Sequence, residues 1–228
     1  MDTRLGLDEV TALMRQATGD EKHEESSTST LDALWVLYDL ILRIDPGDPT
    51  AEDRDRFILS KGHGPIALYA ILAAKEFFPV SWLDAFMTHG GRLGSHPDRS
   101  QVPGVEASTG SLGHGLPIAA GVAMALRAKG LTEPRVFVLC GDAELNEGSN
   151  WEAILLAPQQ HLGNLTLVVV DNHSSSPDMS PWRARLGAFG WDTDVVDGHD
   201  HAALETAFRV RHVNRPTAVV ADVPEGEW

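Results

Sequence analysis

The feature that most constrains the fold is a pair of buried strand patterns, each of which ends in polar residues. Residues 135–140 are mostly apolar and run into Asp142, and residues 165–170 run into Asn172. Residues 150–161, between them, fit one crossover helix. This order predicts a βαβ unit that brings oxygen ligands to the carboxyl ends of two parallel strands. A carboxylate and an amide oxygen there suit Mg²⁺ or Ca²⁺, with room for waters and substrate phosphates.

Composition narrows the class of protein. The 228 residues are 43% hydrophobic and 22% charged, which is ordinary for one globular domain spanning 1–228. A net charge of −15 argues against a nucleic-acid partner, which requires a basic face. No apolar run approaches membrane-spanning length and no signal-peptide pattern opens the chain, so we expect no membrane partner and a cytoplasmic protein. The single cysteine, Cys140, excludes an intrachain disulfide and fits a small buried position.

Strand and helix patterns alternate along the chain. They predict an α/β fold with a doubly wound, mostly parallel sheet and helices on both faces. Strands are predicted at 135–140, 165–170, 193–197 and 217–223. Helices are predicted at 7–17, 31–44, 63–76, 81–88, 113–129, 150–161, 182–188 and 201–211. Residues 18–30, 89–112 and 173–181 have loop composition, and a loop as long as 89–112 is usually functional or mobile.

Several motifs then carry a family resemblance. Gly141-Asp142-Ala143, followed thirty residues later by Asn172, resembles the thiamine diphosphate signature. The surrounding motifs resemble the transketolase family more narrowly, in the same order along the chain, from about Leu31 to Asp222. They are residues 57–63 (FILSKGH), 94–97 (GSHP), 103–113 (PGVEASTGSLG), 147–153 (EGSNWEA), 189–191 (FGW) and 196–200 (VDGHD). The resemblance implies the thiamine diphosphate-binding fold, in its diphosphate domain.

The resemblance also implies a metal and a cofactor site. Asp142, Asn172 and the carbonyl of Ser174 would hold Mg²⁺ or Ca²⁺. An Asp in a strand-end turn and an Asn capping a loop are common without a metal, so that alternative stays open. Thiamine diphosphate would contact residues of two loops: Gly110, Leu112, Gly113, His114, Gly141, Asp142, Ala143, Glu144 and Asn172. Ala143 stands where the family usually has a second glycine, which lets the backbone approach the diphosphate closely.

Four further side chains match catalytic positions of the family. His63, His96 and His23 match histidines that orient a substrate carbonyl and hydroxyls and move protons near neutral pH. The segment around His23 departs from the family, since it lacks the usual glycines. Glu147 matches a residue of an acidic cluster at a subunit interface. A hydrogen-bonded structural histidine and a solvated helix face are the alternatives to these roles.

The resemblance covers only the diphosphate domain. Enzymes of this kind bind the cofactor between two domains, and the second supplies the pyrimidine pocket and an activating glutamate. The chain ends shortly after its last predicted strand. We therefore expect the N-terminal subunit of a split transketolase, with the pyrimidine-binding and C-terminal domains on a partner chain, in an α2β2 heterotetramer. An exposed apolar surface would remain where that partner binds.

The activity implied is transfer of a two-carbon ketol unit from a ketose or ketose phosphate to an aldehyde. The cofactor would supply the chemistry, and this subunit would anchor it and position histidines. Two alternatives remain open from the sequence. The unit could be delivered to a carrier thiol, as in 2-oxoacid dehydrogenases. Alternatively, the chain could be a degenerate, non-catalytic scaffold, which Ala143, the altered His23 segment and the short loop 173–180 favour.

Overall fold

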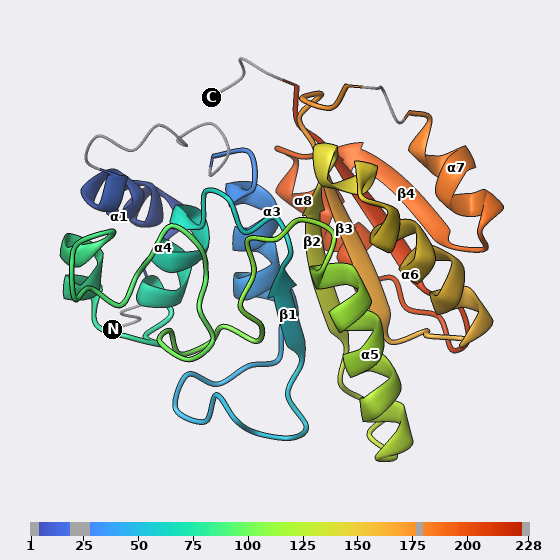
Figure 1. The fold of residues 1–228 in the computed structure, drawn as a ribbon, viewed down its shortest axis with the longest axis horizontal. Coiled ribbons are helices and arrows are strands. Elements are labelled where there is room, and N and C mark those ends of the chain that lie inside the picture. Colours follow the sequence, from blue (N-terminus) through green and yellow to red (C-terminus); the bar gives the residue numbers. More distant parts are fainter. Residues whose placement is uncertain (1–4, 19–27, 177–179, 225–228) are drawn as a thin grey trace.

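The computed structural model describes residues 5–18, 28–176 and 180–224. A parallel five-stranded sheet with the order β1-β2-β3-β5-β4 forms its centre (Figure 1). The strands are β1 (Arg56–Leu59), β2 (Val136–Gly141), β3 (Leu165–Asp171), β4 (Asp192–Asp197) and β5 (Thr217–Asp222). The predicted α/β class and parallel sheet are confirmed.

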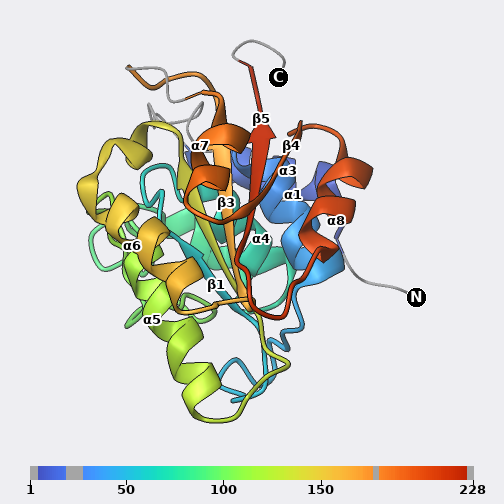
Figure 2. The same ribbon diagram turned by 90° about the vertical axis from the view of Figure 1, so that its right-hand side faces the viewer.

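Helices cover both faces of the sheet, as Figures 1 and 2 show. One face packs against α3 (Leu31–Val36), α4 (Ile66–Ala74) and α8 (His201–Arg209), with α1 (Leu7–Thr18) lying on α4. The other face packs against α5 (Gly115–Ala128), α6 (Gly148–Gln159) and α7 (Trp182–Ala188). Successive strand residues alternate between these two cores, since neighbouring side chains of a strand point to opposite faces. Phe137 lies in the first core and Val138 in the second.

The structure corrects some predicted elements. Residues 56–59 form the edge strand β1, which the sequence patterns did not separate from the histidine segment that follows. The helix predicted at 81–88 is the 3-10 helix η2 (Val80–Ala85). A second 3-10 helix, η3 (Ala143–Asn146), begins directly after Asp142. The loop prediction for 89–112 is confirmed, since the chain forms neither helix nor strand there.

The helix predicted at 31–44 is shorter than expected. After α3 it continues as the π-helix η1 (Leu37–Ile41), and Leu42 is already extended. The backbone of Arg43 then pairs with Asp55, its N–H donating to Oδ2 at 2.9 Å and its carbonyl accepting from the Asp55 N–H at 3.0 Å. These bonds hold the chain beside the start of β1, so tertiary contacts end the helix before the proline that the sequence suggested as its stop.

The single cysteine of the chain lies in the core. Cys140 is fully buried in β2, as expected for a small core residue. Burial raises the pKa of its thiol well above the ordinary value. Among the described helices, none combines the length and apolar character needed to cross a membrane.

Candidate functional site

The predicted metal residues meet at the carboxyl edge of β2 and β3. Asp142 is buried directly after β2, and its backbone N–H donates to the carbonyl of Val170 at 3.1 Å. The Ser174 hydroxyl lies 3.1 Å from Asp142 Oδ1 and 2.7 Å from Asn172 Oδ1. The Ser175 backbone N–H donates to Asp142 Oδ2 at 2.8 Å. Three side-chain oxygens from two strand ends therefore converge within hydrogen-bonding distance.

This donor set fits a hard cation. Carboxylate, amide and hydroxyl or carbonyl oxygens are ligands that Mg²⁺ and Ca²⁺ accept, whereas thiolate and imidazole are absent from the cluster. Within the described ranges, no group of three or more His, Cys, Asp or Glu side chains is arranged to hold a metal. A metal at Asp142 would therefore rely on Asn172, Ser174 and water or substrate oxygens. His173, between Asn172 and Ser174 in the chain, has a φ of 57°, a left-handed backbone conformation that is uncommon for a non-glycine residue.

Beneath this cluster, Glu144 joins three segments of the chain. Its Oε1 accepts from the Ser60 hydroxyl at 2.5 Å and from the Gly113 backbone N–H at 2.9 Å. The Ser60 hydroxyl oxygen accepts in turn from the Gly115 N–H at 3.0 Å. Burial raises the pKa of the Glu144 carboxyl, although these hydrogen bonds oppose the shift. The contacts fix the loop before α5 against the ends of β1 and β2.

Lys61 is a further residue of this edge, which lies within one of the sequence motifs but was not predicted as a site residue. Its aliphatic chain crosses Gly141, where an added Cβ would lie 3.1 Å from Lys61 Cδ. Its ammonium donates to the Ser29 hydroxyl at 3.0 Å. Burial lowers the pKa of Lys61 to about 8, while the charges of Asp142 and Glu144 act in the opposite direction. The sequence feature that could have indicated Lys61 is its place between Ser60 and Gly62, directly after the apolar residues 57–59.

The structure brings His63 and His96 together from positions far apart in the sequence. Their ring centroids are 4.9 Å apart in an edge-to-face arrangement, and both residues are exposed. The His96 ring lies against Gly110, whose φ is 134° and whose added Cβ would fall 2.6 Å from His96 Cδ2. Only glycine tolerates both the conformation and the contact at that position. His23 lies outside the described residues.

The loop before α5 carries the remaining predicted cofactor residues. Gly113 has a φ of 84°, and an added Cβ would lie 2.6 Å from the Cβ of Glu147. His114 is exposed at the N-cap of α5, with Nδ1 3.2 Å from the Ser111 carbonyl and 3.3 Å from that of Leu112. Gly113 and Glu147 thus lie together, so the predicted cofactor loop meets the start of α6.

Ala143 and Thr109 lie beside the predicted cofactor site and affect whether a polar ligand fits there. Ala143 is exposed at the start of η3, so its methyl group faces outward instead of filling the protein interior. The Thr109 hydroxyl is buried and has no hydrogen-bond partner within the described residues. It faces Gly62, where an added Cβ would lie 2.9 Å from Thr109 Oγ1. A buried hydroxyl of this kind needs a partner, which a polar ligand could provide.

The chain matches a known protein family over most of its length. A family model described as the transketolase thiamine diphosphate binding domain matches residues 8–223. The chain belongs to the transketolase family. Its relatives include "Ferredoxin fas2" of Rhodococcoides fascians, 49% identical over 97% of this chain and 73% of that protein. They also include one subunit of an apulose-4-phosphate transketolase of Actinobacillus succinogenes, 35% identical over 90% of this chain and 76% of that protein.

Solved transketolases share the fold. A transketolase from Pichia stipitis superposes with a TM-score of 0.83 and 27% identity, over 95% of this transketolase-family chain and 35% of that one. The transketolase from Leishmania mexicana gives 0.80 and 26%, over 96% and 36%. This chain therefore spans about a third of the length of these solved enzymes, and the thiamine diphosphate-binding fold that we expected is confirmed.

Proposed function

We propose that the chain holds the diphosphate and metal in a thiamine diphosphate-dependent transketolase formed with a partner subunit. The observation that carries this proposal is the convergence of Asp142, Asn172 and Ser174 oxygens, two residues from Glu144, which binds the loop that carries Gly110 and Gly113. Asp142, Asn172 and the Ser174 carbonyl would hold Mg²⁺ or Ca²⁺. Mg²⁺ fits well, since it usually takes one or two carboxylates and completes its shell with water and phosphate oxygens.

The two glycine-bearing loops would form the walls of the cofactor site. Gly110 and Gly113 pack against His96 and Glu147, and Leu112 and His114 stand beside them. The Gly141–Glu144 turn would lie below the diphosphate, with Glu144 bracing the two loops through its carboxylate. Lys61 adds a buried positive charge at this turn, which partly offsets Asp142 and favours an anionic group.

His63 and His96 would bind and orient the substrate. Thiamine diphosphate, when bound, supplies the electron sink for cleaving a ketose next to its carbonyl. The paired imidazoles would orient the sugar carbonyl and hydroxyls by hydrogen bonds and hold or release a proton near neutral pH. His23 is proposed for the same group. The Tyr69 hydroxyl, within 3.1 Å of the Gly94 and His96 carbonyl oxygens, would keep the His96 segment in place.

A partner subunit is proposed from two observations. Relatives that this chain matches over most of their length are named as one subunit of a transketolase. The chain also exposes large apolar side chains on the adjacent helices α5 and α6: Ile118, Met124, Leu155 and Leu156. We propose that they form part of one contact surface, since contiguous exposed apolar groups mark protein interaction sites. Glu147, at the start of α6, would lie beside that surface, in an α2β2 assembly.

The substrate class is proposed from the names of relatives. One is named for apulose 4-phosphate and another, a 34% identical protein of a Clostridium species, for 6-deoxy-6-sulfo-D-fructose. Both names describe a sugar that carries an anionic group. We propose a two-carbon ketol transfer from such a ketose to an aldehyde.

The 49% identical relative is named as a ferredoxin. We do not propose an iron–sulfur cluster for residues 1–228. Iron–sulfur clusters are held by several cysteine thiolates, usually four. This sequence has one cysteine, and Cys140 is buried in β2.

The test is calorimetric titration of thiamine diphosphate and Mg²⁺ into the chain, alone and mixed with a candidate partner subunit. Binding that depends on Mg²⁺ and strengthens in the mixture supports the proposal. Assays of ketol transfer to free aldoses and to a carrier thiol would then show which of the two is the acceptor. Absence of binding in a mixture whose chains still associate would favour a non-catalytic scaffold and overturn the enzymatic proposal.

The partner surface has its own test. Leu155→Glu places a charge on the exposed apolar face of α6 and is expected to weaken association with the partner at least about tenfold. Val213→Glu is the matched control, because Val213 is more exposed, at 89% against 49% for Leu155, and lies on a loop after α8. Equal association of the two variants in analytical ultracentrifugation would place the interface elsewhere.

A further inference from the structure

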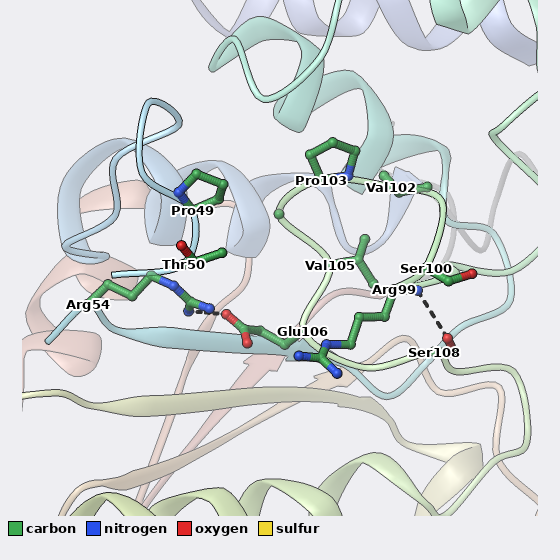
Figure 3. Close-up of a pocket in the computed structure, with 11 residues that line it drawn as sticks. Pro49, Thr50, Arg54, Arg99, Ser100, Val102, Pro103, Val105, Glu106 and Ser108 are labelled. Atoms are coloured by element: carbon green, nitrogen blue, oxygen red, sulfur yellow. Dashed lines mark hydrogen bonds and ion pairs between the residues drawn. The ribbon is translucent and has the colours of Figure 1, made fainter. Parts of the chain in front are cut away.

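A second concave region lies at the amino edge of the sheet, away from Asp142. It is a cavity of about 510 Å³ between the loop before β1 and the segment that follows His96 (Figure 3). Its walls are Pro49, Thr50, Arg54, Arg99, Ser100, Val102, Pro103, Gly104, Val105, Glu106 and Ser108. The volume is that of a small-molecule site.

Arg54 enters this cavity from the β1 side with unused hydrogen-bonding capacity. Its Nη1 is paired with the Glu106 carboxylate and donates to the Asp55 carbonyl at 3.1 Å. Its Nε is buried and has no hydrogen-bond partner among the described residues. Glu106 also faces a second guanidinium, with Arg56 Nε 4.0 Å from its Oε2. One carboxylate is therefore shared by two arginines, and Asp53 and Asp55 also act on Arg56, so the guanidinium with donors left for a ligand is that of Arg54.

Arg99 enters from the opposite loop, as Figure 3 shows. Its backbone N–H donates to the Ser108 hydroxyl at 3.0 Å, whereas its guanidinium has no hydrogen bond or ion pair with any described residue. The nearby Asp98 carboxylate does not neutralise it. Asp98 Oδ1 instead accepts from the Ser100 N–H at 2.8 Å, the Ser100 hydroxyl at 2.8 Å and the Ser108 hydroxyl at 3.2 Å. The Asp98 bonds fix the loop in the shape that presents Arg99.

We propose that this cavity binds a small phosphorylated metabolite, with its phosphate between Arg54 and Arg99. The planar guanidinium group matches phosphate oxygens with paired donors, which Arg99 would supply together with Arg54. In a chain of net charge −15, a local pair of guanidinium groups is a selective place for an anion. Pro103 and Val105 would contact the carbon skeleton.

The site goes beyond the transketolase function proposed above. Its ligand would join the loop before β1 to residues 99–108, and this segment lies between His96 and Gly110 in the chain. The Thr109 N–H donates to the Pro97 carbonyl at 3.2 Å, which closes the base of the segment. A ligand held by Arg99 would therefore restrain the loop that positions His96, and could regulate the enzyme from the far edge of the sheet.

The test uses inorganic phosphate and glycerol 3-phosphate as probes, titrated into the full chain without thiamine diphosphate and followed by amide NMR. The expected result is saturable shifts in residues 49–54 and 99–108, with glycerol 3-phosphate binding more tightly. Arg99→Ala should weaken binding about tenfold or more, since a charge-assisted contact is lost. Glu106→Gln should strengthen it, because a repulsive charge is removed from the cavity.

Arg92→Ala is the matched control, because Arg92 lies on the same long loop but outside the cavity, stacked on Trp82. Its affinity for both probes should stay within about twofold of the parent chain, since the charge it removes is exposed and screened. Acetate distinguishes a phosphate site from a general carboxylate site and should bind more weakly. The proposal is overturned if phosphate shifts no residue of the two segments, or if Arg92→Ala weakens binding as much as Arg99→Ala.

Discussion

The two edges of the sheet carry buried carboxylates with different surroundings. At the carboxyl edge, Asp142 meets Asn172 and Ser174, which are oxygen donors that suit a cation. At the amino edge, Asp55 accepts from the backbone N–H groups of Arg43 at 2.9 Å and Arg135 at 2.7 Å. The first carboxylate retains capacity for a ligand, while the second is used to join the starts of neighbouring strands.

The two edges of the sheet also differ in their arginines. Arg54, Arg56 and Arg135 all lie at the amino edge, and burial lowers the pKa of Arg135 to about 10. Burial of a carboxylate therefore does not by itself mark a functional site. What distinguishes Asp142 is that its neighbours come from loops and leave acceptor positions open, whereas Asp55 is enclosed by backbone donors and guanidinium groups.

The largest effect on stability is expected from Asp55→Ala. The substitution would remove a buried carboxylate and leave the N–H groups of Arg43 and Arg135 without that acceptor, and it is expected to lower the free energy of unfolding by about 3 kcal/mol. Urea denaturation would measure this loss. Metal-dependent cofactor binding by the folded fraction should be unchanged, and a parallel loss of binding would show that the two edges are not independent.

Asp142→Ala is expected to have the opposite effect, with cofactor binding lost and the stability of the fold largely kept. Removing the carboxylate should weaken Mg²⁺-dependent binding of thiamine diphosphate by about 100-fold or more, since a direct ligand matters at least as much as its supporting shell. Calorimetry with the partner subunit present would measure this change. Asp194→Ala is the control, because that exposed carboxylate binds Arg183 and the Val195 N–H on the surface of β4, away from Asp142. Unaltered binding in Asp142→Ala would refute the metal assignment.

Gly113→Ala tests the rigidity of the carboxyl edge. An alanine there would have a φ of 84° and a Cβ 2.6 Å from that of Glu147, so we expect a loss of about 2 kcal/mol in unfolding free energy. Thermal and urea denaturation would measure it. Gly121→Ala is the matched control: it lies in the middle of α5 with no atom within 4 Å of an added Cβ. That variant should gain about 0.5–1 kcal/mol, and destabilisation by both alanines would contradict the reasoning.

The smallest expected effect is the pH dependence of stability that Asp98 contributes in the long loop, residues 89–112. Hydrogen bonds from Ser100 and Ser108 hold the pKa of Asp98 below its ordinary value. A carboxyl group whose pKa is lower in the folded chain stabilises the fold above the unfolded pKa, and this contribution is lost as pH falls through the folded value. Because Asp98 faces solvent, the effect should stay below about 1 kcal/mol. The stability difference between the parent and Asp98→Asn should be present near neutral pH and vanish in acid; a constant difference would exclude this linkage.

The strand and helix patterns predicted much of the fold because burial repeats along the sequence. β2 and β3 are buried throughout, so their apolar runs were visible directly. β1 was missed because four residues are too few to establish a period. The end of η1 was missed because a distant partner, Asp55, sets it.

The candidate site was predicted by motif and assembled by topology. His63 and His96 could be named from their segments, but their 4.9 Å separation depends on the close contact of His96 with Gly110. Lys61 and Glu144 show the limit more clearly. Nothing local in the sequence indicates that Glu144 binds Ser60 and Gly113, since these contacts join segments more than thirty residues apart.

The parallel α/β architecture, the family and the residues of the carboxyl edge could therefore be predicted from the sequence, because periodic burial and strand-end motifs are local properties of the chain. The pairing of the histidines, the position of Lys61 and the arginine-lined cavity at the opposite edge depend on how the chain folds in space. Those features arise where loops from separate strands meet, and a parallel sheet brings together at each edge residues that are far apart along the chain.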